Sequence, residues 1–331
     1  MSDVVYSGAA GLLALEPVAR WGYRRHRAGH GTPRPAYRAM RKLYGGPSTA
    51  RFERLVAGAA QESDPLELGP DPRGVAHGRV DDLVAALRTD GFVRLPEPLA
   101  EDRCAVLESV ALGATCTLIE PTGGAVAARF DPAAPVAVRY EVPEADAVSS
   151  RAAQGLIADP SLLAVAQAYL GAAPIVDLVT MWWSAAVGVG ASSAAAQQYH
   201  FDLDRLRFLK LFVYLTDVDE RTGPHVFVRG SHLAKPAHLR RDGRHSDAAV
   251  EAAFPGGPQV ITGARGSMFL ADTLGLHKGL DLVEGHRLVF QVEWSSSLFG
   301  APFTRPRVAW QDAEAARVAS DHPWAFQRFA S

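Results

Sequence analysis

The feature that most constrains the fold is a succession of short apolar runs in the second half of the chain, separated by turn residues. The runs are rich in β-branched and aromatic residues, and Gly, Pro and Asp lie between them. They cover residues 175–183, 197–201, 208–216, 225–228, 259–261, 267–270 and 287–294. Short strands joined by such turns predict a β sandwich or barrel.

The first half of the chain reads mostly as helix. We expect helices over residues 80–88 and 100–111, and a third that Asp159 caps and Gly171 ends. Short β-rich runs between residues 115 and 142 interrupt the helices. The predicted fold class is therefore mainly β, with helices that flank and cover one face of the strands.

The length of 331 residues suits one large domain with appendages. Residues 62–79 are rich in Pro, Gly, Asp and Ser and read as a linker. We therefore expect a helical N-terminal extension and linker over 1–79, a β domain over 80–300 and a C-terminal extension over 301–331.

Composition excludes several classes of protein. Hydrophobic residues make up 48% and charged residues 21%, as in ordinary globular proteins, and the net charge of −2 argues against a nucleic-acid partner. No apolar stretch approaches the ~20 residues of a membrane span, and the start is a poor signal peptide. We expect a cytoplasmic protein, with Cys104 and Cys116 reduced and buried.

The N-terminal segment is strongly basic. Between residues 1 and 54, ten Lys and Arg face three acidic residues, a net charge of +7, so the rest of the chain carries −9. This segment is either a solvated helical face, a face docked on the acidic body, or a peripheral contact for a membrane surface or an anionic substrate or carrier.

Three side chains suggest a metal site. In a strand, residues two apart point to the same side, so His200 and Asp202 in Tyr-His-Phe-Asp direct an imidazole and a carboxylate at a common point. His277 is the candidate for a third ligand. Two His and one carboxylate on one face of a metal leave three positions open, which suits iron(II) oxygenases.

Arg287 adds to this pattern. It lies ten residues after His277 and opens an apolar strand, so it is expected to be buried. A buried guanidinium needs an anionic partner, and the distal carboxylate of 2-oxoglutarate would pair with it in bidentate fashion.

Each signal has an ordinary alternative. With eleven His in the chain, one His-x-Asp triplet is a weak signal and also fits a surface strand with a hydrogen-bonded His. Two other protein classes remain open at this point. One is a metal-dependent isomerase or hydrolase on a cupin-like barrel, which would leave Arg287 unexplained. The other is a non-catalytic β-barrel binding module.

Four segments, in this order, resemble the phytanoyl-CoA dioxygenase-like oxygenases, and together they cover about residues 80–298. They are the Asp-Gly-Phe strand over 87–96, the His-Phe-Asp of 200–202, the hairpin 214–232 that ends in Gly-Ser-His, and the run from Gly266 through His277 to Arg287. The resemblance implies a double-stranded β-helix (jelly roll, cupin-like).

The resemblance also implies cofactors and roles. The cofactors are Fe(II), 2-oxoglutarate and O2, with His200, Asp202 and His277 as catalytic metal ligands and Arg287 holding 2-oxoglutarate. It suggests that Phe212 lies near the cosubstrate. The expected reaction is hydroxylation, or another oxidation, of a C–H bond in a small molecule. Related halogenases have a small residue in place of the Asp202 carboxylate, so chlorination is not expected.

The sequence departs from the family pattern at Gly279, where a Ser often follows the distal His by two residues. Arg287 then needs another partner, and we expect Gln198, on the same strand face as His200, to be a candidate. His232 is expected to pack in a loop, His225 to be structural or to contact substrate, and Asp202 rather than Asp204 to bind the metal.

Two further expectations concern the pocket. Alternation places one of Trp182 and Trp183 toward the pocket and the other toward the outer layer. Candidate lid segments are 188–196, 205–210 and 236–253, which carry a rim of cations that would attract an anionic or carrier-linked substrate. The rim cations are Arg205, Arg207, Lys210, Arg240, Arg241 and Arg244.

Overall fold

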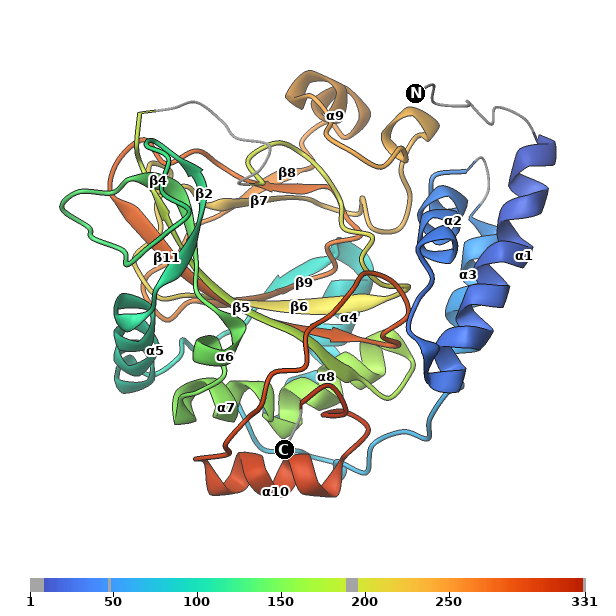
Figure 1. The fold of residues 1–331 in the computed structure, drawn as a ribbon, viewed down its shortest axis with the longest axis horizontal. Coiled ribbons are helices and arrows are strands. Elements are labelled where there is room, and N and C mark those ends of the chain that lie inside the picture. The colour runs from blue at the N-terminus through green and yellow to red at the C-terminus, as the bar shows by residue number, and fades with distance from the viewer. Residues whose placement is uncertain (1–8, 47–48, 189–195, 330–331) are drawn as a thin grey trace.

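The computed structural model describes residues 9–46, 49–188 and 196–329. Two β-sheets lie face to face, one helical layer packs beneath the larger sheet, and a separate group of helices stands at one end of the sheets (Figure 1). This arrangement confirms the predicted fold class, a mainly β protein with flanking helices.

The larger sheet is entirely antiparallel. Within the described residues it has eight strands, in the order β1-β9-β6-β11-β5-β4-β2-β3. Its central strands are buried along almost their whole length, as expected for strands covered on both faces. The strands are β1 (Phe92–Arg94), β2 (Cys116–Pro121), β3 (Ala127–Ala128), β4 (Ala137–Glu141), β5 (Ile175–Ala185), β6 (Phe208–Tyr214), β9 (Met268–Ala271) and β11 (His286–Ser295).

The smaller sheet closes the barrel. Its described strands run in the order β10-β7-β8, with bounds β7 (His225–Val228), β8 (Pro258–Ile261) and β10 (His277–Gly279). His200 extends this sheet by an isolated antiparallel bridge to His277. The two sheets together form the double-stranded β-helix.

Side chains alternate between two apolar layers. An inner cluster lies between the sheets and includes Trp182, Phe212 and Phe269. Trp183 belongs to a larger outer cluster under the helices and stacks on Phe130 with ring centroids 4.3 Å apart. The expected division of the two tryptophans between pocket and outer layer is confirmed.

The helices fall into three groups. Those that cover the outer face of the large sheet are α4 (Val80–Asp90), α5 (Glu101–Gly113), α6 (Glu144–Ala147), α7 (Arg151–Ile157) and α8 (Pro160–Leu170). The N-terminal group is α1 (Ala9–Arg25), the π-helical turn η1 (His26–His30), α2 (Arg34–Tyr44) and α3 (Ala50–Ala59). The rest are η2 (Ala237–Leu239), α9 (Asp247–Ala253) and α10 (Ala313–Asp321).

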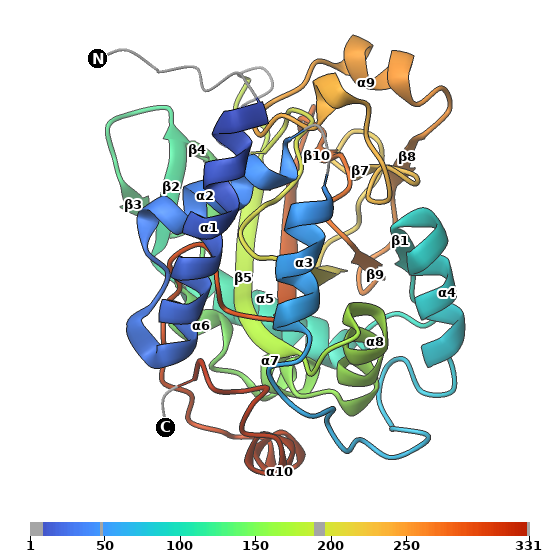
Figure 2. The ribbon, with the colours of Figure 1, turned by 90° about the vertical axis from the view of Figure 1, so that its right-hand side faces the viewer.

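The N-terminal helices are docked on the barrel. Their apolar faces share a buried cluster with Tyr199, Phe201 and Phe299, next to the His200 segment. Figure 2 shows α1, α2 and α3 side by side in front of β5. Of the three interpretations of the basic segment, the docked one accounts for its buried face, while Arg24, Arg25 and Arg38 stay exposed.

Most expected elements form close to their expected bounds. Asp159 Oδ1 accepts a hydrogen bond from the Leu162 amide, and Gly171 ends α8 with φ of 65°, a left-handed conformation that suits glycine. Cys104 and Cys116 are free and buried, as predicted. None of the described helices combines the length and apolar character needed to cross a bilayer.

The predicted strand over 197–201 is wrong in extent. Among the described residues, only Tyr199 and His200 form bridges there, to His245 and His277. The reason is the partner: β10 spans three residues, and its His277 exchanges both backbone hydrogen bonds with His200. Asp202 therefore lies in an extended loop just beyond the ladder.

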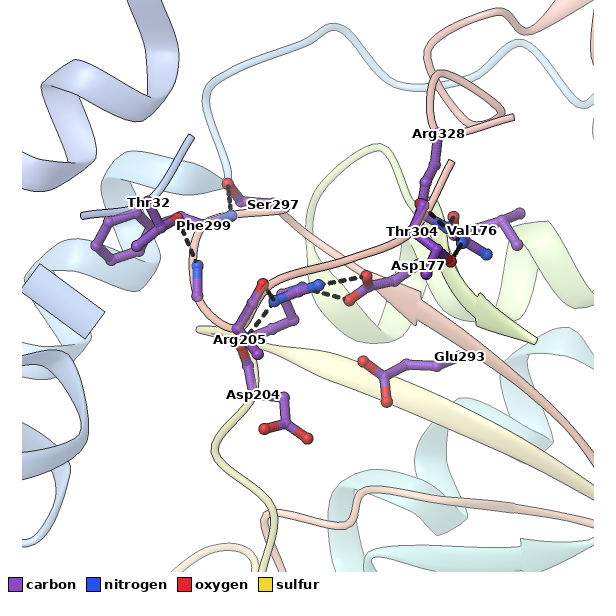
Figure 3. Close-up of polar contacts among 12 residues, drawn as sticks. Thr32, Val176, Asp177, Asp204, Arg205, Glu293, Ser297, Phe299, Thr304 and Arg328 are labelled. Carbon is purple, nitrogen blue, oxygen red and sulfur yellow. Dashed lines mark hydrogen bonds and ion pairs between the residues drawn. The ribbon is translucent and has the colours of Figure 1, made fainter. Parts of the chain in front are cut away.

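A buried arginine, Arg328, connects the C-terminal tail to the barrel. Arg328 has no exposed surface, and its guanidinium contacts both Glu144 carboxylate oxygens, at 2.5 and 2.9 Å. Its Nε also donates to the carbonyl of Val176 at 3.2 Å (Figure 3). The tail, α6 and β5 are thus joined through one ion pair.

We expect Arg328→Ala to lower the free energy of unfolding by about 3–5 kcal/mol, because it leaves Glu144 as a largely buried, unpaired charge. Chemical denaturation measures this change. The matched control is Arg317→Ala, which breaks the exposed pair with Asp321 in α10 and should cost less than about 1 kcal/mol. Equal effects of the two substitutions would contradict this account of the tail.

Candidate metal centre and active site

Two histidines and one aspartate converge at the edge of the small sheet. His277 begins β10, and His200 is its bridge partner, so both side chains project to the same face. The backbone amide of Asp202 donates to the Thr273 carbonyl at 2.8 Å, which fixes the loop beyond the bridge. One potential ligand atom from each of the three side chains lies within 4.8 Å of the others.

Backbone carbonyls orient both imidazoles. His200 Nδ1 lies 2.8 Å from the Gln198 carbonyl, and His277 Nδ1 lies 3.0 Å from the Gly275 carbonyl. A carbonyl only accepts, so each Nδ1 carries the hydrogen and each Nε2 presents its lone pair. Nε2 of His200 is 3.8 Å from Asp202 Oδ1, and Nε2 of His277 is 3.6 Å from Oδ2.

The electrostatics keep the three groups in their ligand forms. Burial and then the neighbouring His277 lower the pKa of His200 to about 3, and burial also lowers the pKa of His277. Burial alone would raise the pKa of Asp202, but the Lys210 ammonium and the two histidines hold it below its usual range. Two neutral imidazoles thus face one carboxylate at neutral pH.

These residues fit a divalent iron. Ligand atoms of one ion bound at about 2.1 Å lie roughly 3–3.5 Å apart, close to the separations between these nitrogens and oxygens. Two His and one carboxylate on one face also match the ligand set that leaves three positions for other ligands. The structure therefore brings together all three side chains that the sequence nominated as metal ligands.

Lys210, on β6, contacts the same carboxylate. Its Nζ donates to Asp202 Oδ2 at 2.7 Å and lies 3.2 Å from Glu293 Oε2, and the Lys210 and Glu293 side chains are almost fully buried. Burial raises the pKa of Glu293 to about 8, against the effect of Lys210. Lys210 thus holds one oxygen of Asp202 and leaves the other free.

Arg205 is fixed in a second buried ion pair beside this one. Its guanidinium donates to both oxygens of Asp177, at 2.6 and 2.8 Å, and Glu293 lies next to them (Figure 3). The expectation that Arg205 and Lys210 belong to an open cationic rim is wrong. Both side chains turn inward and are neutralised by carboxylates on β5, β11 and the Asp202 loop.

Arg287 lies inside the barrel, at the opposite end of β11 from Glu293. It is 5% exposed, and its Nη2 is 3.5 Å from Ser184 Oγ. Among the described residues, its buried Nε and Nη1 have no hydrogen-bond partner, so no carboxylate contacts either nitrogen. Burial lowers the pKa of Arg287 to about 10, so it remains a cation at neutral pH.

The hydroxyl beside Arg287 comes from a position that the sequence analysis did not nominate. Ser184 is the register partner of Arg287 across β5 and β11, so both point to the same face. Trp182 points inward, and alternation along β5 could have identified Ser184 as its neighbour on that face. A Cβ on Gly279 would meet Arg287 Nη2 at an ordinary contact distance of 3.7 Å, so glycine leaves this flank open.

Phe212 and Gln198, the other two residues predicted to lie near the cosubstrate, have different surroundings. Phe212 lies in the inner cluster, stacked on Phe269 with centroids 4.9 Å apart and 4.6 Å from the His225 ring. Gln198 is half-buried, and its main-chain carbonyl serves the site by orienting His200. The expectation that its side chain partners Arg287 stays a prediction.

Neighbouring candidates are separated from the centre. Asp204 accepts a hydrogen bond from the Tyr37 hydroxyl at 3.1 Å and is not part of the three-residue group, in agreement with the preference for Asp202. His225 faces the interior beside Phe212, and burial, followed by Arg287, holds its pKa well below the usual value. His232 packs against Gly91 in its loop.

The sequence profile of the phytanoyl-CoA dioxygenase family matches residues 87–278, more than half of the chain. The chain belongs to this family. It is an Fe(II)- and 2-oxoglutarate-dependent oxygenase, and its cofactors are Fe(II), 2-oxoglutarate and O2. No curated protein matches the chain in sequence. The matched range excludes the N-terminal helices and the C-terminal tail, and the division at 79 and 300 stays a prediction.

Several solved structures are similar to this chain. EctD from S. alaskensis is 19% identical over 70% of this chain and 81% of its own, with a TM-score of 0.47. HygX from Streptomyces hygroscopicus, solved with nickel and 2-oxoglutarate bound, is 18% identical over 71% and 92%, with a TM-score of 0.46. AviO1 from Streptomyces viridochromogenes is 17% identical over 67% and 97%, with a TM-score of 0.46.

We expect His277→Ala to weaken metal binding by more than about 100-fold, because even residues behind the ligands typically contribute 10–100-fold. Titration of the metal-free protein with Co(II), followed by visible absorption, measures the affinity. The control is His238→Ala in η2, where an exposed imidazole outside the group is removed. Unchanged Co(II) affinity in His277→Ala would exclude this site.

We expect Lys210→Met to lower the free energy of unfolding of the metal-free protein by about 3 kcal/mol or more, because Asp202 is left as a buried carboxylate without its counter-ion. A divalent ion would restore positive charge beside Asp202, so added Co(II) should recover part of the loss. Denaturation with and without Co(II) measures both effects, with the exposed Lys42→Met as control. A variant as stable as the parent without metal would refute this role.

Proposed function

We propose that this protein hydroxylates, or oxidises in another way, an unactivated C–H bond of a small-molecule substrate, and that succinate and CO2 are the co-products. In this proposal His200, Asp202 and His277 hold the iron and Arg287 holds the distal carboxylate of 2-oxoglutarate. Family membership establishes the class of oxygenase. The roles of these four residues and the class of substrate are proposed in addition.

One observation carries the proposal. Arg287 is a buried cation with two unpaired nitrogens among the described residues, inside the same barrel as the three-residue group. A buried guanidinium is stable only with an anion that accepts its hydrogen bonds. A dicarboxylate with one end at the metal and the other at Arg287 supplies that anion, which an isomerase, a hydrolase or an inert binding module does not require.

The residues of the chain have distinct tasks in this mechanism. His200, Asp202 and His277 would hold the iron, which would supply the means to activate O2 as the oxidant and to bind the chelating end of the cosubstrate. Arg287 and Ser184 orient the far end of the cosubstrate, and the aromatic residues between the sheets exclude water. Lys210 keeps Asp202 ionised and fixed by one oxygen, so that the other oxygen remains free for the metal.

Asp202 also bears on the outcome. In related halogenases a small residue at the corresponding position makes room for chloride. The carboxylate of Asp202 occupies that position here, and it supports hydroxylation, desaturation or ring closure rather than chlorination.

A cavity at the Glu293 end of the barrel is the proposed substrate entrance. It has a volume of about 340 Å³ and lies one residue, Lys210, away from Asp202. Its lining includes five acidic side chains (Glu141, Glu144, Asp177, Asp204 and Glu293) and one cation, Arg205, which is already paired with Asp177. This lining does not support the anionic or carrier-linked substrate expected from a cationic rim, and a neutral or polar small molecule fits it better.

The three candidate lid segments differ in what the described residues say of them. Residues 189–195 of the segment 188–196 lie outside the described residues. Segment 205–210 is inner barrel wall rather than lid, because Arg205 and Lys210 are buried. Segment 236–253 carries η2 and α9 above the small sheet and remains a candidate (Figure 1).

Anaerobic addition of 2-oxoglutarate to the Fe(II)-loaded protein tests the proposal. We expect a weak visible charge-transfer absorption when the cosubstrate chelates the metal, and succinate on admission of O2. Arg287→Gln should raise the dissociation constant (Kd) of 2-oxoglutarate by about 100-fold, the loss expected for a bidentate charged pair.

The matched control is Arg229→Gln, which removes an exposed guanidinium in the hairpin loop after β7 and should leave the affinity unchanged. An Fe(II)-loaded protein that develops no such absorption, or an Arg287→Gln variant that binds 2-oxoglutarate as the parent does, would refute the proposal.

A further inference from the structure

A second guanidinium faces the barrel interior beside Arg287. Arg139 on β4 is the register partner of Ser184 on β5, and Ser184 is also the register partner of Arg287 on β11. Paired residues in antiparallel strands project to the same face, so the three side chains form one row across three strands. The two arginine Cα atoms are then about 10 Å apart, with the serine hydroxyl between them.

The local contacts of Arg139 hold its guanidinium in place. Its Cζ lies 4.3 Å from the centre of the Trp182 ring, and Nη2 is 3.0 Å from Glu141 Oε1. Its side chain is 17% exposed, and its buried Nε has no hydrogen-bond partner among the described residues. Its neighbours therefore orient Arg139 but leave at least its Nε without a hydrogen-bond acceptor among the described residues.

The two arginines influence each other electrostatically. After burial, Arg139 is the neighbour that further lowers the pKa of Arg287, while Tyr214 acts in the opposite direction. His225 lies within reach of both, since each contributes to its lowered pKa. Two cations in one buried space repel each other, and an anion between them removes the repulsion.

The carboxylates nearby do not supply that anion. Glu141 contacts Arg139 from the half-exposed end of its side chain. Of the ion pairs among the described residues, none includes Arg287. The row of Arg139, Ser184 and Arg287 thus has guanidinium donors on both sides of a hydroxyl and, among the described residues, no carboxylate that contacts both guanidiniums.

We propose that Arg139 is a second binding residue for the distal carboxylate of 2-oxoglutarate, acting with Arg287 and Ser184 as a three-residue anion site. This inference rests on the proposed function of Arg287. Each carboxylate oxygen accepts more than one hydrogen bond, so two guanidiniums and one hydroxyl can share a single carboxylate. The open flank at Gly279 leaves room for it on the side of the small sheet.

The test separates carboxylate binding from a structural role by using two ligands. Anaerobic Fe(II)-loaded protein is titrated with 2-oxoglutarate and with 2-oxopentanoate, which has the same chelating end but a methyl group in place of the distal carboxylate. Arg139→Gln should raise the Kd of 2-oxoglutarate about tenfold, as for one lost charged hydrogen bond, and change that of 2-oxopentanoate less than about twofold. An equal change for both ligands, or none for either, overturns the proposal.

Two further variants strengthen the test. Glu141→Gln breaks the same ion pair but keeps the guanidinium, so 2-oxoglutarate should bind as tightly as before or more tightly. If Glu141→Gln weakens binding as much as Arg139→Gln, the pair is structural and the proposal fails. Arg139→Lys keeps the charge but loses the planar fork, and should weaken 2-oxoglutarate severalfold with no effect on 2-oxopentanoate. It replaces Arg139→Gln if that variant does not fold.

Arg287→Gln shows whether a negative result concerns the whole 2-oxoglutarate site or only the role of Arg139. If it leaves the affinity for 2-oxoglutarate unchanged, the proposed function itself is wrong. If Arg287→Gln weakens binding and Arg139→Gln does not, the cosubstrate site stands and only the role of Arg139 is refuted.

Discussion

The active centre depends on a single antiparallel bridge between His200 and His277. The two residues exchange both backbone hydrogen bonds, at 3.0 and 2.9 Å, and so place two imidazoles on the same face of the small sheet. The ring centroids are 4.3 Å apart, and each ring is fixed by a carbonyl two residues before it. The bridge has little support from neighbouring ladder, so the N-terminal helices that pack on Tyr199 and Phe201 stabilise the outer side of the same segment.

The charged groups are distributed along the barrel by their positions in the large sheet. One end of β11 carries Arg287, in a row with Ser184 and Arg139, and is rich in positive charge. The other end carries Glu293, which meets Lys210 across β6 and lies next to the Arg205–Asp177 pair. In the proposed function, this polarity would orient a dianionic cosubstrate with one carboxylate at the guanidiniums and the chelating end toward the metal residues.

Local sequence patterns were sufficient for the broad architecture and for the principal candidates. Alternation placed His200 and Asp202 on a common side and Trp182 and Trp183 on opposite sides, and the apolar run after Arg287 predicted a buried arginine, which the structure has. The family resemblance, more than spacing, connected His277 and Arg287 to the His-x-Asp pair, although 74 residues separate Asp202 from His277.

What the sequence did not reveal depends on pairing between distant strands. Lys210 and Arg205 look like surface cations in a linear reading, but the register of β6 with β11 and the position of Asp177 turn them inward. Arg139 carries no local signal of function, because its row with Ser184 and Arg287 exists only when β4, β5 and β11 align. The short His200 bridge was likewise invisible without the length of β10.

The most direct test of the central claim is a crystal structure of the protein with Mn(II), in place of iron, and 2-oxoglutarate. The account predicts one metal bound by His200 Nε2, His277 Nε2 and one Asp202 oxygen, with the cosubstrate chelating it and its distal carboxylate at Arg287. A metal bound by other residues, or a cosubstrate whose distal carboxylate lies away from Arg287, would contradict it.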